Sequence, residues 1–106
     1  MPIVPGGFVS HAEIAGEVDR AIAKLGPEVV RVRYSVGEDN TGDPAIYFRI
    51  VLTDGASREE TLGEVTEKIR RTLSDELRSF ENWGLFPYFR FRSQKEQALL
   101  QDPAWT

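Results

Sequence analysis

The chain contains no cysteine, and only one histidine and one methionine stand among its 106 residues. The lack of thiols excludes a disulfide scaffold, a thiolate zinc site and a cysteine nucleophile in this chain. No apolar run approaches the roughly 20 residues that span a bilayer, and the first residues lack the basic and apolar segments of a signal peptide. We therefore expect a cytoplasmic protein with no membrane partner.

Residues that could perform catalysis are also scarce. His11 directly follows Ser10 at the start of a predicted helix, and neighbours in a helix do not form a nucleophile–base pair. The run EDNTGD at 38–43 offers oxygen ligands, but it lacks the alternating spacing and the closing glutamate of a calcium loop. The sequence thus predicts no catalytic residue, no metal site and no cofactor, and an enzyme is the less favoured class.

The residues that are present indicate one folded domain. Hydrophobic residues make up 41% of the chain and charged residues 28%, with a formal net charge of -4, which is a globular composition rather than a disordered one. Residues 1–9 combine two prolines and two glycines with apolar side chains, so they predict an N-terminal arm. Residues 10–106 predict a single domain.

Three helices are expected from apolar spacing and from capping boxes, in which a serine and a glutamate stand three residues apart. The first is expected at about 11–25, ended by Gly26 in a left-handed conformation. The second begins near 58 and would outrun the strands if it reached 82, so SFENW at 79–83 is expected to be loop. The third is short and is followed by Trp105, which either folds back or inserts into a neighbour. The boxes are Ser10–Glu13, Ser57–Glu60 and Ser93–Glu96.

Three other segments alternate apolar and polar side chains, as half-buried strands do: 28–36, 45–53 and 85–92. In the first, Val30 and Val32 are expected on the core side. The turn-rich run 37–44 joins the first two segments as a hairpin. Pro87 has no amide to donate, so the third segment is an edge strand or begins after this proline.

The order α-β-β-α-β-α predicts an α+β two-layer sandwich, with helices on one face of a small mixed sheet. This order resembles the ferredoxin-like βαββαβ arrangement with its first strand reduced, a topology that many unrelated functions share. The runs GDPAIYFRIVLTD and GLFPYFRFRSQKEQ, at 42–54 and 84–97, resemble short bacterial proteins without an assigned activity. No functional residue follows from that resemblance.

Arginine and tyrosine occupy the alternate strand positions that oppose the apolar ones. Guanidinium groups and aromatic rings are frequent anchors of protein interfaces. We therefore predict a small interaction module that uses this face or the edge strand at 88–92, as an adaptor, an antitoxin-like protein or a homo-oligomer. The candidate binding residues are Arg31, Arg33, Tyr47, Arg49, Tyr88, Arg90 and Arg92.

Two alternatives stay open. The same arginines could bind an anion or nucleic acid, because RNA-recognition modules stack bases on aromatic residues of a sheet. Against this, FPYFRFR has a proline where such a motif has glycine, and the net charge of -4 opposes attraction to phosphate. The other alternative is a solvated face, in which long arginine stems only cover the sheet.

Overall fold

The helices and strands follow one another in the expected order, with two short helices added. The computed structural model describes residues 11–105. The N-terminal arm expected at 1–9, and Ser10 of the first expected capping box, lie outside the described residues. The elements are α1 (His11–Ile22), β1 (Val29–Glu38), β2 (Pro44–Leu52), α2 (Glu59–Leu77), α3 (Ser79–Trp83), β3 (Phe86–Ser93), α4 (Gln94–Leu100) and the 3-10 helix η2 (Pro103–Trp105).

The three strands form one mixed sheet in the order β1-β2-β3. β1 and β2 pair antiparallel as a hairpin, and β3 pairs parallel to β2 after the crossover through α2. The expectation of a small α+β fold with a mixed sheet is confirmed. The ferredoxin-like arrangement is not confirmed, because β2 and β3 pair directly, whereas a split β-α-β unit would place another strand between them.

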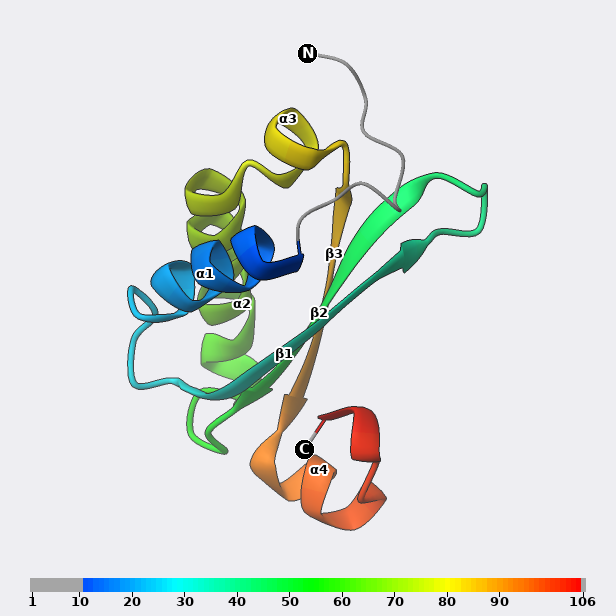
Figure 1. Cartoon of the computed structure of the whole chain (residues 1–106). Helices are drawn as coiled ribbons and strands as arrows, with labels where there is room; N and C mark the ends of the chain where they lie inside the picture. The colour runs from blue at the N-terminus through cyan, green and yellow to red at the C-terminus, as the bar shows by residue number, and fades with distance from the viewer. Residues whose placement is uncertain (1–10, 106) are drawn as a thin grey trace.

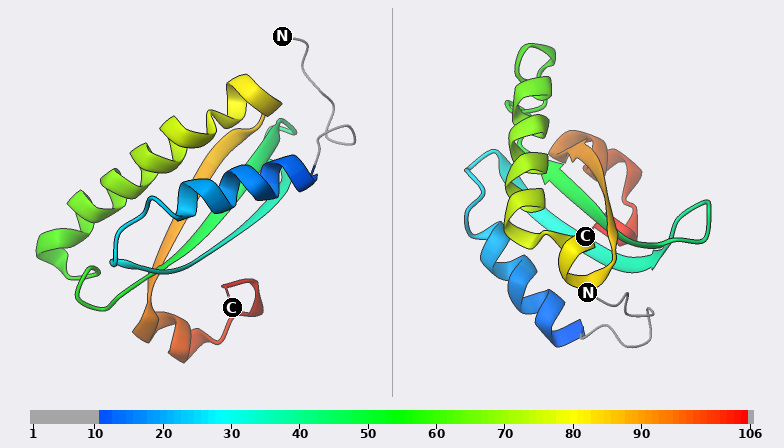
Figure 2. Two further views of the ribbon diagram at one scale, coloured as in Figure 1. Left: turned by 60° about the vertical axis from the view of Figure 1, so that its left-hand side comes forward. Right: turned by 90° about the horizontal axis from the view of Figure 1, so that it is seen from above.

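The two long helices and the C-terminal segment lie on opposite faces of the sheet. α1 and α2 run side by side over one face, and α4 with η2 lies against the other (Figures 1 and 2). Under the long helices, Phe48 and Ile50 of the sheet pack with Ile14 of α1 and Leu73 of α2. The expectation of helices on one face is therefore confirmed for α1 and α2, whereas α4 lies on the other face with the C-terminal contacts described below.

One expected helix end and one expected helix cap are wrong. α1 ends at Ile22, and Gly26 is not among the residues with positive φ. α2 begins after Arg58, which caps it without a side-chain hydrogen bond. Ser57 is not the cap because it lies one residue before Arg58, in the turn after β2, where its hydroxyl donates to the carbonyl of Thr53 at 3.1 Å. The Ser93–Glu96 capping box at α4 is confirmed.

The junction between α2 and β3 is a short helix rather than the expected loop. Arg78 adopts a left-handed conformation with φ 44°, which ends α2, and SFENW then forms α3. Gly84, with φ 68°, ends α3 in turn, in a conformation that glycine adopts at little steric cost. The chain therefore turns at the end of the sheet and enters β3 at Phe86.

A bulge near the start of β1 changes the expected face of one valine. The register with β2 shifts between Val29 and Arg31, and a bulge places two residues opposite one. Val29 packs against the core, whereas Val30 is 38% exposed. The expectation that Val30 faces the core is wrong, and that for Val32, which is buried, is confirmed.

Candidate interaction surface

All of the candidate binding residues lie on the sheet face that α1 and α2 leave uncovered, which we call the outer face. Residues paired in register across a sheet point to the same side. The pairings give three rows across the sheet: Ser35–Tyr47–Tyr88, Arg33–Arg49–Arg90 and Arg31–Val51–Arg92. The rows place every predicted side chain on one surface, but the two ends of that surface differ.

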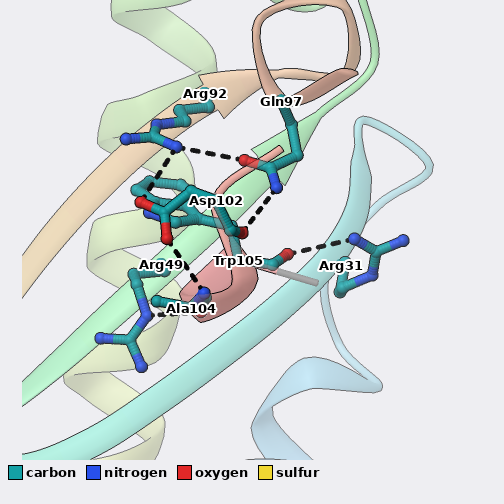
Figure 3. A network of polar contacts seen from close by, with 7 residues as sticks. All are labelled: Arg31, Arg49, Arg92, Gln97, Asp102, Ala104 and Trp105. Atoms are coloured by element: carbon teal, nitrogen blue, oxygen red, sulfur yellow. Dashed lines mark hydrogen bonds and ion pairs between the residues drawn. The ribbon is translucent and has the colours of Figure 1, made fainter. Parts of the chain in front are cut away.

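One end of the outer face is covered by the chain itself, through the C-terminal segment (residues 94–105). Trp105 is only 4% exposed there. Arg31 donates from Nη1 to the Trp105 carbonyl at 3.1 Å, and Arg49 donates from Nε to the Ala104 carbonyl at 2.8 Å (Figure 3). Val51, the middle residue of the last row, is buried although it lies on the outer face. Trp105 folds back on its own chain, which is one of the two expected outcomes.

Arg92 joins β3 to the same segment. Its guanidinium carbon lies 4.3 Å from the centroid of the Trp105 ring. Its Nη1 donates to Gln97 Oε1 at 3.1 Å and lies 3.5 Å from Asp102 Oδ2, as Figure 3 shows. Gln97 in turn donates from Nε2 to the Asp102 carbonyl at 2.8 Å. Three of the predicted arginines thus donate hydrogen bonds to the chain's own C-terminal segment: Arg31, Arg49 and Arg92.

The other end of the outer face, beside the β1–β2 hairpin, is open. Tyr47 and Tyr88 stack there with centroids 5.4 Å apart and an interplanar angle of 20°. The Tyr47 hydroxyl donates to the Glu38 carbonyl at 2.6 Å, and the Tyr88 hydroxyl donates to Asp39 Oδ2 at 2.9 Å. Arg90 is exposed and forms no hydrogen bond or ion pair with the residues that the structure describes. A hollow of about 430 Å³ lies among these side chains.

Asp39 is the carboxylate that accepts hydrogen bonds at this open end. Its Oδ1 accepts hydrogen bonds from the Thr41 hydroxyl at 2.7 Å and from the Thr41 and Asp43 amides. The Thr41 hydroxyl is the main cause that lowers the pKa of Asp39 from 3.8 to about 2. The Asp39 carboxylate raises the pKa of Tyr88 by accepting a hydrogen bond from its hydroxyl group. Asp39 therefore stays charged at neutral pH, and within residues 11–105 it has no ion-pair partner.

β3 is one of the two edge strands of the described sheet, as Pro87 predicts. It pairs with β2 on one side, and no strand of the described chain pairs with its other side. Between this edge and α2 lies a groove of about 450 Å³, to which Leu62 and Phe91 contribute apolar surface. An open edge presents a row of unpaired backbone donors and acceptors. The groove and the open end of the outer face flank this edge on its two sides.

The described residues do not gather into a site for other chemistry. Residues 11–105 contain no cluster of three or more metal-ligating His, Asp or Glu side chains, and none of the helices in this range could cross a lipid bilayer. A hollow of about 720 Å³ between β1 and α4 is lined by Val30, Val51, Asp54 and Gln97 among others.

Comparisons of the chain with protein-family models, with curated proteins and with solved structures find no match. The function must therefore be inferred from the contacts of these residues. Sequence reasoning missed Asp39 as the partner of Tyr88, and it missed Gln97 and Asp102 as partners of Arg92. The aromatic residue near the C-terminus was the one local signal that the outer face has a covering.

Proposed function

We propose that the chain is a protein-interaction module that binds an extended polypeptide segment at the open edge of β3. The observation that supports this proposal is the pairing of β3 on one side only. An added strand gains affinity from main-chain hydrogen bonds, and the surfaces above and below the sheet select its alternate side chains.

Each side of the β3 edge offers a different surface to such a segment. On the outer face, Tyr47 and Tyr88 are held in place by their hydroxyl hydrogen bonds, and Arg90 stands beside them without an internal partner among the described residues. Tyrosine and arginine are enriched among the residues that dominate binding energies. On the other side, Leu62 and Phe91 form the apolar part of the groove. The bound segment would alternate polar and apolar side chains to match.

The remaining predicted arginines have less support as binding residues, and one of them, Arg33, lies on β1, which β2 separates from the open edge of β3. Arg31, Arg49 and Arg92 already donate to the C-terminal segment. This also weakens the alternative of an anion or nucleic-acid surface, because Asp39 lines the same hollow as Arg90 and the net charge is -4. We expect no binding of single-stranded RNA even at about 50 mM salt, where phosphate contacts are strong.

Affinity purification with a matched pair of variants tests the proposal. Tagged wild-type chain, a Tyr88→Glu/Arg90→Glu variant and an Arg33→Glu/Ser35→Glu variant serve as baits, and untagged copies of the chain are scored among the captured proteins. The control variant carries its charges on the same face but on β1. We expect the β3 variant to recover about tenfold less partner and the β1 variant to recover as much as wild type. Equal recovery from both variants would contradict the proposal.

A further inference from the structure

The outer side of β3 divides into an aromatic half and a basic half. Phe86 and Tyr88 come first and are 40% and 41% exposed, and Arg90 and Arg92 follow. Arg92 is neutralised by Asp102 and covered by the C-terminal segment. Arg90 is therefore the cation that β3 presents to a strand added beside it.

Pro87 indicates which backbone groups face the open edge. Proline lacks the amide hydrogen, and within an edge strand it occupies positions where that hydrogen would point to solvent. Alternate residues of a strand direct their amide and carbonyl groups to the same side. Pro87, Phe89 and Phe91 are thus expected to face the open edge, while Tyr88 and Arg90 bond to β2.

β3 of a second copy of the chain could pair antiparallel with this edge. A two-fold axis would relate the two strands, and the residue at which the axis lies sets which side chains are opposite each other. An axis at Arg90 would place two arginines opposite each other, which is unfavourable. An axis at Tyr88 would pair only residues 86–90 of β3. An axis at Phe89 pairs residues 86–92 and sets Tyr88 opposite Arg90 and Phe86 opposite Arg92.

We infer that the segment bound at the β3 edge is β3 of a second copy of this chain, antiparallel about a two-fold axis at Phe89. The inference rests on the proposed function, since it fills the same edge, and it names the partner. The two sheets then join into one continuous sheet through their β3 strands. Self-complementarity of this kind is what a two-fold interface requires.

Charge complementarity supports this register. Arg90 of the second copy stands opposite Tyr88, whose hydroxyl donates to Asp39 at 2.9 Å. Each copy thus brings a cation and an anion that lack ion-pair partners among its own described residues. The two-fold axis places Arg90 of one copy over the ring of Tyr88 of the other copy, and the hydroxyl of that Tyr88 is bonded to Asp39. An arginine over an aromatic face is itself attractive.

The opposite side of the sheet is complementary in apolar surface. Phe89 faces Phe89 of the second copy, and Phe91 faces Pro87 of the second copy. Phe89 and Phe91 are only partly buried against the core within one chain. Pro87 of the second copy enters the groove beside Leu62 and Phe91. Pairing therefore removes apolar surface from water on this side without placing a charge opposite a charge on β3.

Light scattering after size exclusion measures the mass that the inference predicts. Wild-type chain is expected to elute with twice the mass of one chain. Arg90→Glu removes the cation that lies opposite Tyr88 of the other copy, so we expect its dimer dissociation constant to rise at least about tenfold. Arg33→Glu, on β1 and on the same face, is the matched control and is expected to remain dimeric.

The absence of cysteine allows a clean test of the register. Tyr88→Cys and Arg90→Cys chains are mixed and oxidised, because opposed residues of a non-hydrogen-bonded antiparallel pair have Cα atoms about 4.5 Å apart, which is within disulfide reach. The mixed dimer keeps one intact Tyr88–Arg90 pair. We expect disulfide dimers that contain one chain of each variant, distinguished by tags of different size, and few dimers of either variant alone.

The outcomes separate this inference from the proposed function. A monomer that still captures other proteins through β3 overturns the second copy as occupant and keeps the interaction module. If the chain is monomeric and captures no protein through β3, both the second copy as occupant and the interaction module are overturned. A dimer that tolerates Arg90→Glu and forms no mixed disulfide between positions 88 and 90 overturns the register, whereas a sensitive dimer with that disulfide supports it.

Discussion

Replacing Trp105 with alanine would measure how much the docking of the C-terminal segment on the outer face contributes to the free energy of unfolding. The indole is 4% exposed and lies 4.3 Å from the Arg92 guanidinium. Burial removes roughly 200 Å² of a tryptophan from water, which is about 5 kcal/mol at ~25 cal/mol per Å². Measured Trp→Ala losses are about 3–5 kcal/mol. Because the segment can detach instead of retaining a cavity, we expect the free energy of unfolding to fall by about 3 kcal/mol.

Urea denaturation followed by far-ultraviolet circular dichroism provides the measurement. Leu99→Ala is the control, since Leu99 belongs to the same segment and is 78% exposed. Its effect should stay within about 0.5 kcal/mol, as for other surface substitutions. If Trp105→Ala has an equally small effect, the segment is not docked as described, and Arg31, Arg49 and Arg92 return to the open surface.

Two further predictions concern the start of α2 and the hairpin. Arg58 caps α2 in an extended conformation without a side-chain hydrogen bond, so Arg58→Ser should raise the free energy of unfolding by about 1 kcal/mol in urea titrations; no gain would contradict this. The pKa of Asp39 is lowered from 3.8 to about 2 in the folded chain, so its carboxylate stabilises the fold above pH 3.8 and this contribution is lost as the pH falls through about 2. The stability advantage of wild type over Asp39→Asn should therefore shrink across that range, and a difference independent of pH would refute the assignment.

The strands are the elements that local sequence predicts best. Each alternates apolar with polar side chains and is rich in β-branched and aromatic residues, so period and propensity agree. Val30 is the exception, because a bulge inserts a residue without leaving a mark in the pattern of the valines. Pro87 correctly marked the edge, since the missing amide restricts where such a strand can lie.

Helix starts are harder to predict because the preceding turn decides which residue reaches the cap position. Ser57 and Glu60 have the spacing of a capping box, but Ser57 belongs to the turn after β2, and Arg58 occupies the cap position of α2. Ser93 and Glu96 have the same spacing and do form the box, because β3 leads directly into α4. The motif alone does not distinguish the two cases.

The candidate surface is predictable in its composition but not in its accessibility. The alternation that places arginines on the outer face is local, whereas the contacts that cover three of them join residues far apart in sequence. Arg31 meets Trp105 and Arg49 meets Ala104 through hydrogen bonds to backbone carbonyls, which any residue type could supply. No sequence pattern specifies such a contact, so the open and covered halves can be distinguished only in three dimensions.

Amide hydrogen exchange along β3 tests most directly whether its open edge receives a strand. At concentrations where the chain self-associates, the amides of Phe89 and Phe91 should exchange slowly in wild type and rapidly in Arg90→Glu. The amides of Tyr88 and Arg90, which are expected to bond to β2, should be protected in the wild-type chain at every concentration. Rapid exchange at Phe89 and Phe91 in wild type at all concentrations, or equal rates in both proteins, would contradict the pairing of this edge.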